Sequence, residues 1–409
     1  MKPLLSFAPL ALALLPGIVS AAVPVVSNVV ASQRTGTKLV DITYNVADAD
    51  GDSLKIRVEV SDNAGTTYAV PAFALTGAVG DNIAPGTGKT IVWNAGVDWD
   101  GEYSEQMRVK VIATDSKGFP GLEWGNEVPP GGFLMGQDGG AEGSGPSRHV
   151  NIPWSFWMSK YEIRNDEYCE FLNTAIATGR ITQDTTSVKS VLGFWTGIGS
   201  NLELLQIGDA KDIRWNVNKF EVASNRTNFP VTVTWYGALA FAQQYGYDLP
   251  TDAEWEKAAR GPLYDDQGEH TSFPWGNAFS NAYGNFAGSG DPFEITFSGY
   301  GKTPVGYYNG NQTPLGPDTK NGYGLYDLIG NVDEWTRSTL VALDTYNQEE
   351  SLAAPQHSLT SSTTTRVVRG GHSKMSSTSS INFRTYNRNP GIRTYYDITG
   401  FRVVRRSTP

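Results

Sequence analysis

Residues 321–335 read NGYGLYDLIGNVDEW, and this stretch of the sequence is the most informative about the fold. Glycine and asparagine stand among bulky aromatic and aliphatic side chains, which is typical of a structured loop held by its large residues. The whole chain has this character, since its 409 residues include 45 Gly, 22 Pro, 19 Tyr, 17 Phe and 11 Trp. We therefore expect a loop-rich α+β fold rather than a helical bundle.

The N-terminus, residues 1–21, has the pattern of a secretory signal peptide. Lys2 is followed by a largely apolar run over 4–15 and by small residues at 19–21. A membrane anchor is the alternative, but two prolines interrupt the run and it is short. No later segment reaches the length that membrane spanning needs. The pattern predicts an exported protein, whether periplasmic, extracellular or at the cell surface, that does not span the membrane.

Residues 23–116 alternate apolar and polar positions in short runs such as LKIRVEV and MRVKVIATD, with turn signals between them. This spacing predicts a small β-sandwich, and the stretch resembles fibronectin-type or immunoglobulin-like modules. Asp48, Asp50 and Asp52 have the spacing of calcium ligands, but no glutamate closes a calcium loop after them, which favours a turn. Residues 117–132 are rich in Gly and Pro and predict a linker to a second unit at 133–405.

The helices expected in the second unit are few. Thr234 precedes the apolar run WYGALAFAQQYG as a helix cap, and Thr251 with Glu254 forms a capping box before AEWEKAAR. Gly261 is expected to end that helix. The sole cysteine, Cys169, lies in the helical pattern NDEYCEFLN, where a thiol is more often a core residue than a nucleophile.

The charge balance bears on partners. With 32 Lys and Arg against 42 Asp and Glu, the formal net charge is −10, which argues against nucleic acid as a partner.

Eight segments across the second unit together resemble the formylglycine-generating enzyme family, also called sulfatase-modifying factors. The resemblance implies a variant of the C-type lectin fold with little regular structure, long loops and a small twisted sheet. The segments are GGFLMG (131–136), SKYEIRNDEYCEFLN (159–173), FPVTVTWYGALAFA (229–242), LPTDAEWEKAARG (249–261), FPWGN (273–277), NGYGLYDLIGNVDEW (321–335), RVVRGG (366–371) and GFRVVR (400–405).

The resemblance also implies a chemistry that this chain does not match. Enzymes of the family bind copper through two cysteines and use oxygen to convert the cysteine of a sulfatase Cys-x-Pro-x-Arg motif into formylglycine. Counted from Gly371, those cysteines fall on Met375 and Ser380. A thioether is a weak ligand and serine cannot replace a thiolate, so copper is not expected and enzyme activity is left open. His372 stands where the family has a serine, and a single unpaired histidine is usually structural.

Calcium is the cofactor that the resemblance favours. One family site falls on Asp327, the carbonyls of Gly330 and Val332, and Glu334, and hard oxygen ligands of this kind suit calcium. The alternative is that the two carboxylates cap loops without a metal. Asp333 replaces a tryptophan of the family pattern.

A second and weaker calcium site falls on Asn285, Phe286 and Tyr300. Ser298 stands where the family has an aspartate, so this site loses a charged ligand.

The segment 372–399 is rich in Ser, Thr, Tyr, Asn and Arg, the side chains that antibody paratopes use. Three hypotheses follow: a protein or peptide ligand bound at this C-terminal surface, an oxidase with a non-standard site, or a surface diversified by a retroelement, as in some proteins of this fold. The candidate ligand-binding residues are His372, Lys374, Met375, Ser380, Arg384, Tyr386, Arg393, Tyr395 and Tyr396.

Overall fold

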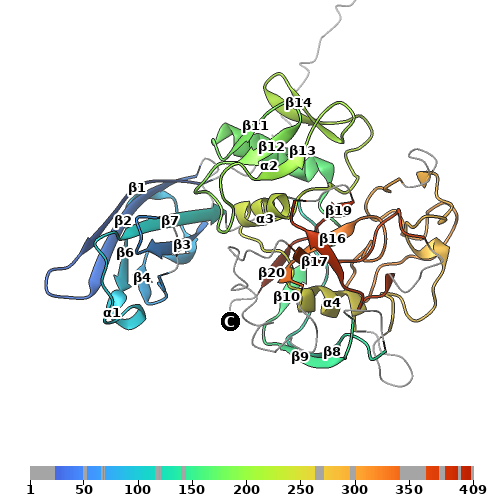
Figure 1. The fold of residues 1–409 in the computed structure, drawn as a ribbon, viewed down its shortest axis with the longest axis horizontal. Coiled ribbons are helices and arrows are strands. Elements are labelled where there is room, and N and C mark those ends of the chain that lie inside the picture. Colours follow the sequence, from blue (N-terminus) through green and yellow to red (C-terminus); the bar gives the residue numbers. More distant parts are fainter. Residues whose placement is uncertain are drawn as a thin grey trace, which may run out of the picture. The chain divides into compact units, whose positions relative to one another are not determined.

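A computed structural model describes the chain in two compact units, Met1–Ala113 and Thr114–Pro409, which we treat separately (Figure 1). The predicted signal peptide lies outside the described residues. Among those residues, no helix is long and apolar enough to cross a membrane. The described residues are 24–48, 53–65, 68, 70–115, 119, 121–139, 144–262, 271–294, 301–340, 365–376, 383–394 and 398–406.

The first unit is rich in β-structure. One sheet has the order β1-β2-β6-β4 and the other the order β5-β3-β7. Ile42 and Tyr44 of the first sheet share one hydrophobic core with Ile56 and Val60 of the second. The fibronectin or immunoglobulin assignment stays a prediction, and Asp50 and Asp52 lie outside the described residues. The elements are β1 (Val25–Gln33), β2 (Leu39–Ala47), β3 (Leu54–Ser61), β4 (Leu75–Gly77), β5 (Gly80–Ile83), β6 (Gly86–Asn94), α1 (Ala95–Asp98) and β7 (Arg108–Asp115).

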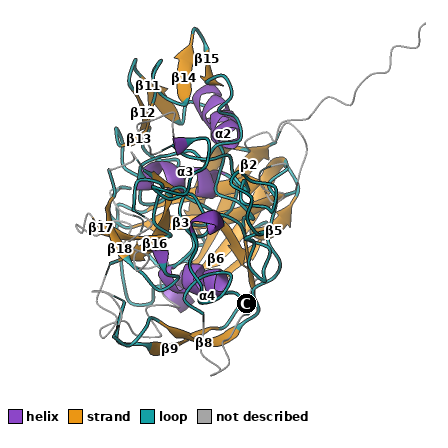
Figure 2. Ribbon diagram, turned by 90° about the vertical axis from the view of Figure 1, so that its right-hand side faces the viewer, coloured by secondary structure: helices purple, strands orange, loops and turns teal. Residues whose placement is uncertain are grey.

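The second unit is mostly β with few helices, which is consistent with the fold that the resemblance implies (Figure 2). Its central sheet has the order β18-β17-β16-β19, with β16 antiparallel to β17 and parallel to β19. The remaining strands form small separate sheets. The central strands are β16 (Asp333–Thr339), β17 (Thr365–Arg369), β18 (Asn389–Ile392) and β19 (Thr399–Gly400). The others are β8 (Gly131–Met135), β9 (Arg148–Ile152), β10 (Phe156–Met158), β11 (Ile181–Gln183), β12 (Ser187–Ser190), β13 (Glu203–Gln206), β14 (Ile213–Asn216), β15 (Lys219–Val222) and β20 (Val404–Arg406).

Two of the helices begin at the predicted caps, Thr234 and Thr251, and the second of them ends at the predicted Gly261. The helices are α2 (Asn165–Ala177), α3 (Trp235–Gln244) and α4 (Asp252–Arg260), with one 3-10 turn, η1 (Asn281–Tyr283). The hydroxyl of Thr234 accepts the Gly237 N–H at 3.1 Å. Thr251 and Glu254 exchange the two bonds of a capping box, at 3.1 and 2.8 Å. Gly261 follows α4 with φ of 65°, a conformation that glycine adopts without strain.

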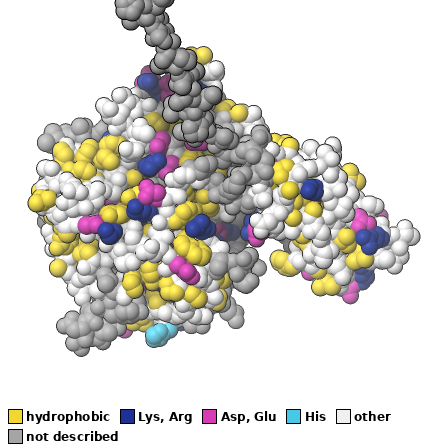
Figure 3. Space-filling model, turned by 180° about the vertical axis from the view of Figure 1, so that it is seen from behind, with side chains coloured by type: hydrophobic (Ala, Val, Ile, Leu, Met, Phe, Trp, Pro, Cys, Tyr) yellow, Lys and Arg dark blue, Asp and Glu magenta, His cyan; other side chains and the backbone are white. Residues whose placement is uncertain are grey.

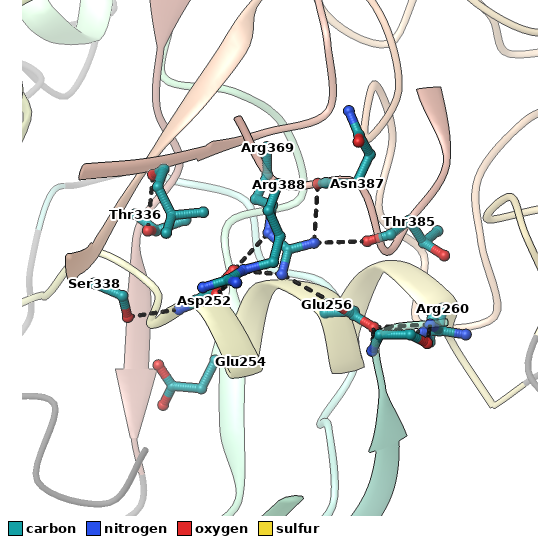
Figure 4. A network of polar contacts seen from close by, with 12 residues as sticks. Asp252, Glu254, Glu256, Arg260, Thr336, Ser338, Arg369, Thr385, Asn387 and Arg388 are labelled. Carbon is teal, nitrogen blue, oxygen red and sulfur yellow. Dashed lines mark hydrogen bonds and ion pairs between the residues drawn. The ribbon is translucent and has the colours of Figure 1, made fainter. Parts of the chain in front are cut away.

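The arginine before the glycine pair 370–371 holds α4 against the central sheet (Figure 4). Arg369 is fully buried and donates to Asp252 at 2.6 Å and to Glu256 at 2.9 Å. Arg388 donates to the same Asp252 at 2.7 Å. Burial opposes ionisation of Asp252, but the two guanidinium groups outweigh it and lower its pKa. These arginines therefore stabilise the unit rather than face a partner.

Candidate functional site

The segment that follows β17 makes a tight reversal. Gly370 and Gly371 have φ of 90° and 72°, and a Cβ on Gly371 would lie 2.8 Å from the Phe383 ring. The Met375 N–H then donates to the His372 carbonyl at 3.0 Å. The Met375 side chain is partly buried against the core that contains Phe383, so its thioether is used in packing. Ser380, the other position of the family's cysteine pair, lies outside the described residues.

His372 and Asp333 face each other beside this reversal, with Nε2 3.9 Å from Oδ2. The Lys374 N–H donates to Nδ1 of His372 at 3.2 Å, which places the proton of the neutral ring on Nε2, toward Asp333. Burial and the Lys374 charge lower the pKa of His372 to about 4. Burial and the Glu334 charge raise the pKa of Asp333 to about 8. The sequence marks both residues as departures from the family pattern, but nothing in it connects them.

A cavity of about 500 Å³ opens beside Ser373 and Lys374. Its lining includes four cationic side chains and one carboxylate, together with several apolar side chains. Sequence reasoning named Lys374 as a ligand-binding residue and missed the other charged residues, because they come from segments scattered over the unit. The charged lining residues are Lys211, Asp212, Arg226, Lys302 and Lys374, and the apolar ones include Leu205, Ile213, Val231, Val332 and Ile398.

Asp212 organises two of the cations. Its Oδ1 accepts from Arg226 Nε at 2.9 Å and its Oδ2 accepts from Lys302 Nζ at 2.7 Å. The Lys302 ammonium also donates to the Pro230 carbonyl at 2.7 Å. Burial opposes ionisation of Asp212, but Lys302 and Arg226 outweigh it and lower its pKa to about 2. Asp212 is therefore charged at neutral pH and balances one of the positive charges around it.

Two other candidate ligand-binding residues, Tyr386 and Arg393, have buried side chains. Tyr386 is 2% exposed and accepts a hydrogen bond from Arg384 at 2.5 Å. Arg393 is buried, with its guanidinium over the rings of Trp235 and Tyr236. In this structure these side chains pack the unit. Tyr395 and Tyr396 lie outside the described residues.

The residues of the first expected calcium site fit a metal incompletely. Both carboxylate oxygens of Glu334 accept from Arg402, at 2.6 and 2.7 Å, and one also accepts from Trp255 Nε1 at 2.6 Å. Three of about four acceptor positions are thereby used. Asp327 is less engaged, since one of its oxygens accepts from the Gly306 N–H at 2.5 Å. Burial, with a smaller contribution from the Glu334 charge, raises the pKa of Asp327 to about 6, although the Gly306 N–H and Arg402 oppose the rise.

The second expected calcium site fits better than its sequence suggests. Asn285 is 1% exposed and its amide nitrogen donates to the Gly301 carbonyl at 2.9 Å. Its Oδ1 is buried with no partner among the described residues, and so is the hydroxyl of Thr303. Both residues hydrogen-bond to Oδ1 of Asn331, at 3.2 and 3.0 Å, so the two unpartnered oxygens belong to neighbouring groups. A buried oxygen without a donor costs about 1–3 kcal/mol, and a hard cation would remove that cost. Phe286 offers its carbonyl, which also accepts from Ser289, while Tyr300 lies outside the described residues.

Clusters of acidic side chains provide no further metal site among the described residues. The described residues contain no group of three or more His, Cys, Asp or Glu side chains that could hold a metal ion.

The model of the sulfatase-modifying factor enzyme 1-like domain matches residues 126–407. The chain belongs to this family. Mouse (Mus musculus) formylglycine-generating enzyme is 31% identical over 230 residues, which cover 51% of this chain and 56% of the enzyme. Cattle (Bos taurus) inactive C-alpha-formylglycine-generating enzyme 2 is 30% identical over 254 residues, 54% of this chain and 75% of that protein. Among solved structures, PvdO from Pseudomonas aeruginosa has a TM-score of 0.42 at 22% identity, covering 69% of this chain and 93% of PvdO.

Proposed function

We propose that this sulfatase-modifying-factor-like protein is exported and binds a protein or peptide ligand without the oxidase chemistry of its relatives. One observation carries the proposal: the chain has a single cysteine. Copper(I) in this family is held by a thiolate pair, and one cysteine cannot supply it.

The position of that cysteine supports the same reading. Cys169 lies in α2, in a core that contains Tyr168 and Phe171, and burial raises its pKa to about 12. Met375, at the position of a family cysteine, packs against a different core. The thiol is therefore protonated at neutral pH, and it packs in a different core from the Met375 side chain.

The relatives do not decide between an active and an inactive protein. One matched relative is called a formylglycine-generating enzyme and another an inactive one, at 31% and 30% identity. The proposal that the protein is inactive as an oxidase rests instead on Met375 and Ser380, which stand at the positions of the family's cysteine pair. The cavity beside Lys374, at about 500 Å³, has the size that small-ligand and short-peptide sites usually have.

Mass spectrometry tests the proposal. A Cys-x-Pro-x-Arg peptide is incubated with the purified chain, copper, reductant and oxygen, with an active family enzyme run alongside. We expect the active enzyme to convert the cysteine to formylglycine and this chain to leave it unchanged. Conversion by this chain would favour the alternative, an oxidase that works through a non-standard site.

A further inference from the structure

We infer that the cavity beside Lys374 binds an acidic side chain, Asp or Glu, of a peptide ligand. The inference rests on the proposed function, because it names the chemistry of the ligand that the protein would bind. It is carried by the lining, which contains four cations, Lys211, Arg226, Lys302 and Lys374, and the single carboxylate of Asp212.

This local charge runs against the composition of the chain. The protein carries a formal net charge of −10, so cations are the minority of its charged residues. On the face shown in Figure 3, basic and acidic side chains are interspersed. Around the cavity, in contrast, the described lining residues have an excess of three positive charges. A cationic pocket in an acidic protein attracts carboxylates and disfavours cations.

Two of the cations that line the cavity are held in place before any ligand binds. Asp212 accepts from both Arg226 and Lys302, which fixes the two side chains. Lys302 has three N–H groups, and its described acceptors, Asp212 and Pro230, use two of them. The third is available to a carboxylate. Because these side chains are already ordered, binding costs little conformational entropy.

Lys374, which also lines the cavity and whose side chain is exposed, supplies a second contact. The apolar lining, which includes Ile213, Val231 and Ile398, suits a hydrophobic side chain next to the acidic one. The arginine of a Cys-x-Pro-x-Arg motif would instead meet like charge here. The cavity is therefore suited to a different peptide from the one that the active family enzymes oxidise.

Selection from a random heptapeptide library displayed on phage tests the inference with the intact chain. We expect the recovered sequences to be enriched in Asp and Glu relative to the unselected library. Enrichment in Lys or Arg, or in neutral sequences only, would overturn the acidic ligand while leaving peptide binding in place. Recovery of no sequence above an uncoated support would instead count against the proposed function itself.

Two matched variants locate the binding. Lys374→Ala removes a charge at the cavity, and Lys219→Ala removes another exposed charge, on the β14–β15 hairpin and outside the cavity lining. For a recovered acidic peptide, we expect Lys374→Ala to weaken binding about five-fold and Lys219→Ala to leave it unchanged. Equal effects of the two variants would show that the peptide responds to general charge and would overturn the assignment to this cavity.

Discussion

His372 Nε2 lies 3.9 Å from Asp333 Oδ2, although the two residues are far apart in the chain. The pairing arises where the reversal after β17 meets the start of β16. It places a histidine with a low pKa, about 4, beside the position of the family's missing cysteine. Its neighbours, Lys374 and Asp333, are the charged or titratable groups that face it. The first prediction concerns the stability that this neutral histidine contributes.

Folding favours the neutral form of His372, because its pKa in the folded chain is lowered from 6.5 to about 4. Its contribution to stability is therefore complete above pH about 6.5 and is lost as the pH falls toward 4. Between pH 6.5 and pH 4, we expect the free energy of unfolding of His372→Gln to fall by about 2 kcal/mol less than that of the wild type. Denaturant unfolding of the second unit at pH 7 and pH 4.5 measures this. His149→Gln alters an exposed histidine, and we expect its free energy of unfolding to fall by as much as that of the wild type.

The second prediction concerns the buried ion pairs in Figure 4. Arg369→Ala removes one of the two buried cations that pair with each of Asp252 and Glu256, since Arg388 and Arg260 remain. We expect the free energy of unfolding to fall by about 3 kcal/mol. Arg214→Ala removes an arginine whose side chain is 46% exposed, and we expect a change below about 1 kcal/mol. Chemical denaturation compares the two. Similar small losses would mean that the network does not hold α4 to the sheet.

The third prediction concerns the closest approach of α3 to β13. A Cβ on Gly237 would lie 2.3 Å from the Leu204 carbonyl oxygen and 2.7 Å from the Tyr168 hydroxyl. Alanine usually stabilises a helix by about 1 kcal/mol relative to glycine. Here we expect Gly237→Ala to destabilise by at least about 2 kcal/mol, because backbone must shift. Gly199→Ala is the control, since its Cβ would meet only Leu202 at 3.8 Å. A more stable Gly237→Ala variant would contradict the packing.

The fourth prediction separates the two expected calcium sites. If calcium binds at the unpartnered Oδ1 of Asn285, calcium should raise the melting temperature of the wild type, and Asn285→Ala should abolish the rise. Asp327→Asn is then expected to keep it. The opposite pattern would place calcium at Asp327, with Glu334 sharing its carboxylate between the ion and Arg402. No rise in the wild type would remove calcium from both sites. Calorimetry with and without calcium makes the measurement.

Local sequence determined the helices and the family. The caps at Thr234 and Thr251 act over three residues, so the sequence contains both partners of each hydrogen bond. The single cysteine, which carries the proposed function, is likewise a property of the sequence alone. The same is true of the loop-rich character of the second unit, which follows from many turn formers among large aromatic residues.

Only the tertiary structure decided how charges are partnered. Glu334 matches a calcium ligand by position, but Arg402 and Trp255 occupy its carboxylate in the folded chain. The cationic cavity likewise brings Asp212 and Lys302 together from distant loops. The behaviour of a charged or polar group depends on its neighbours in space, since burial and pairing set its pKa and the hydrogen bonds that it can still make. Those neighbours come from segments that are far apart in the sequence and have no regular spacing. Local sequence patterns therefore could not predict which groups would be paired.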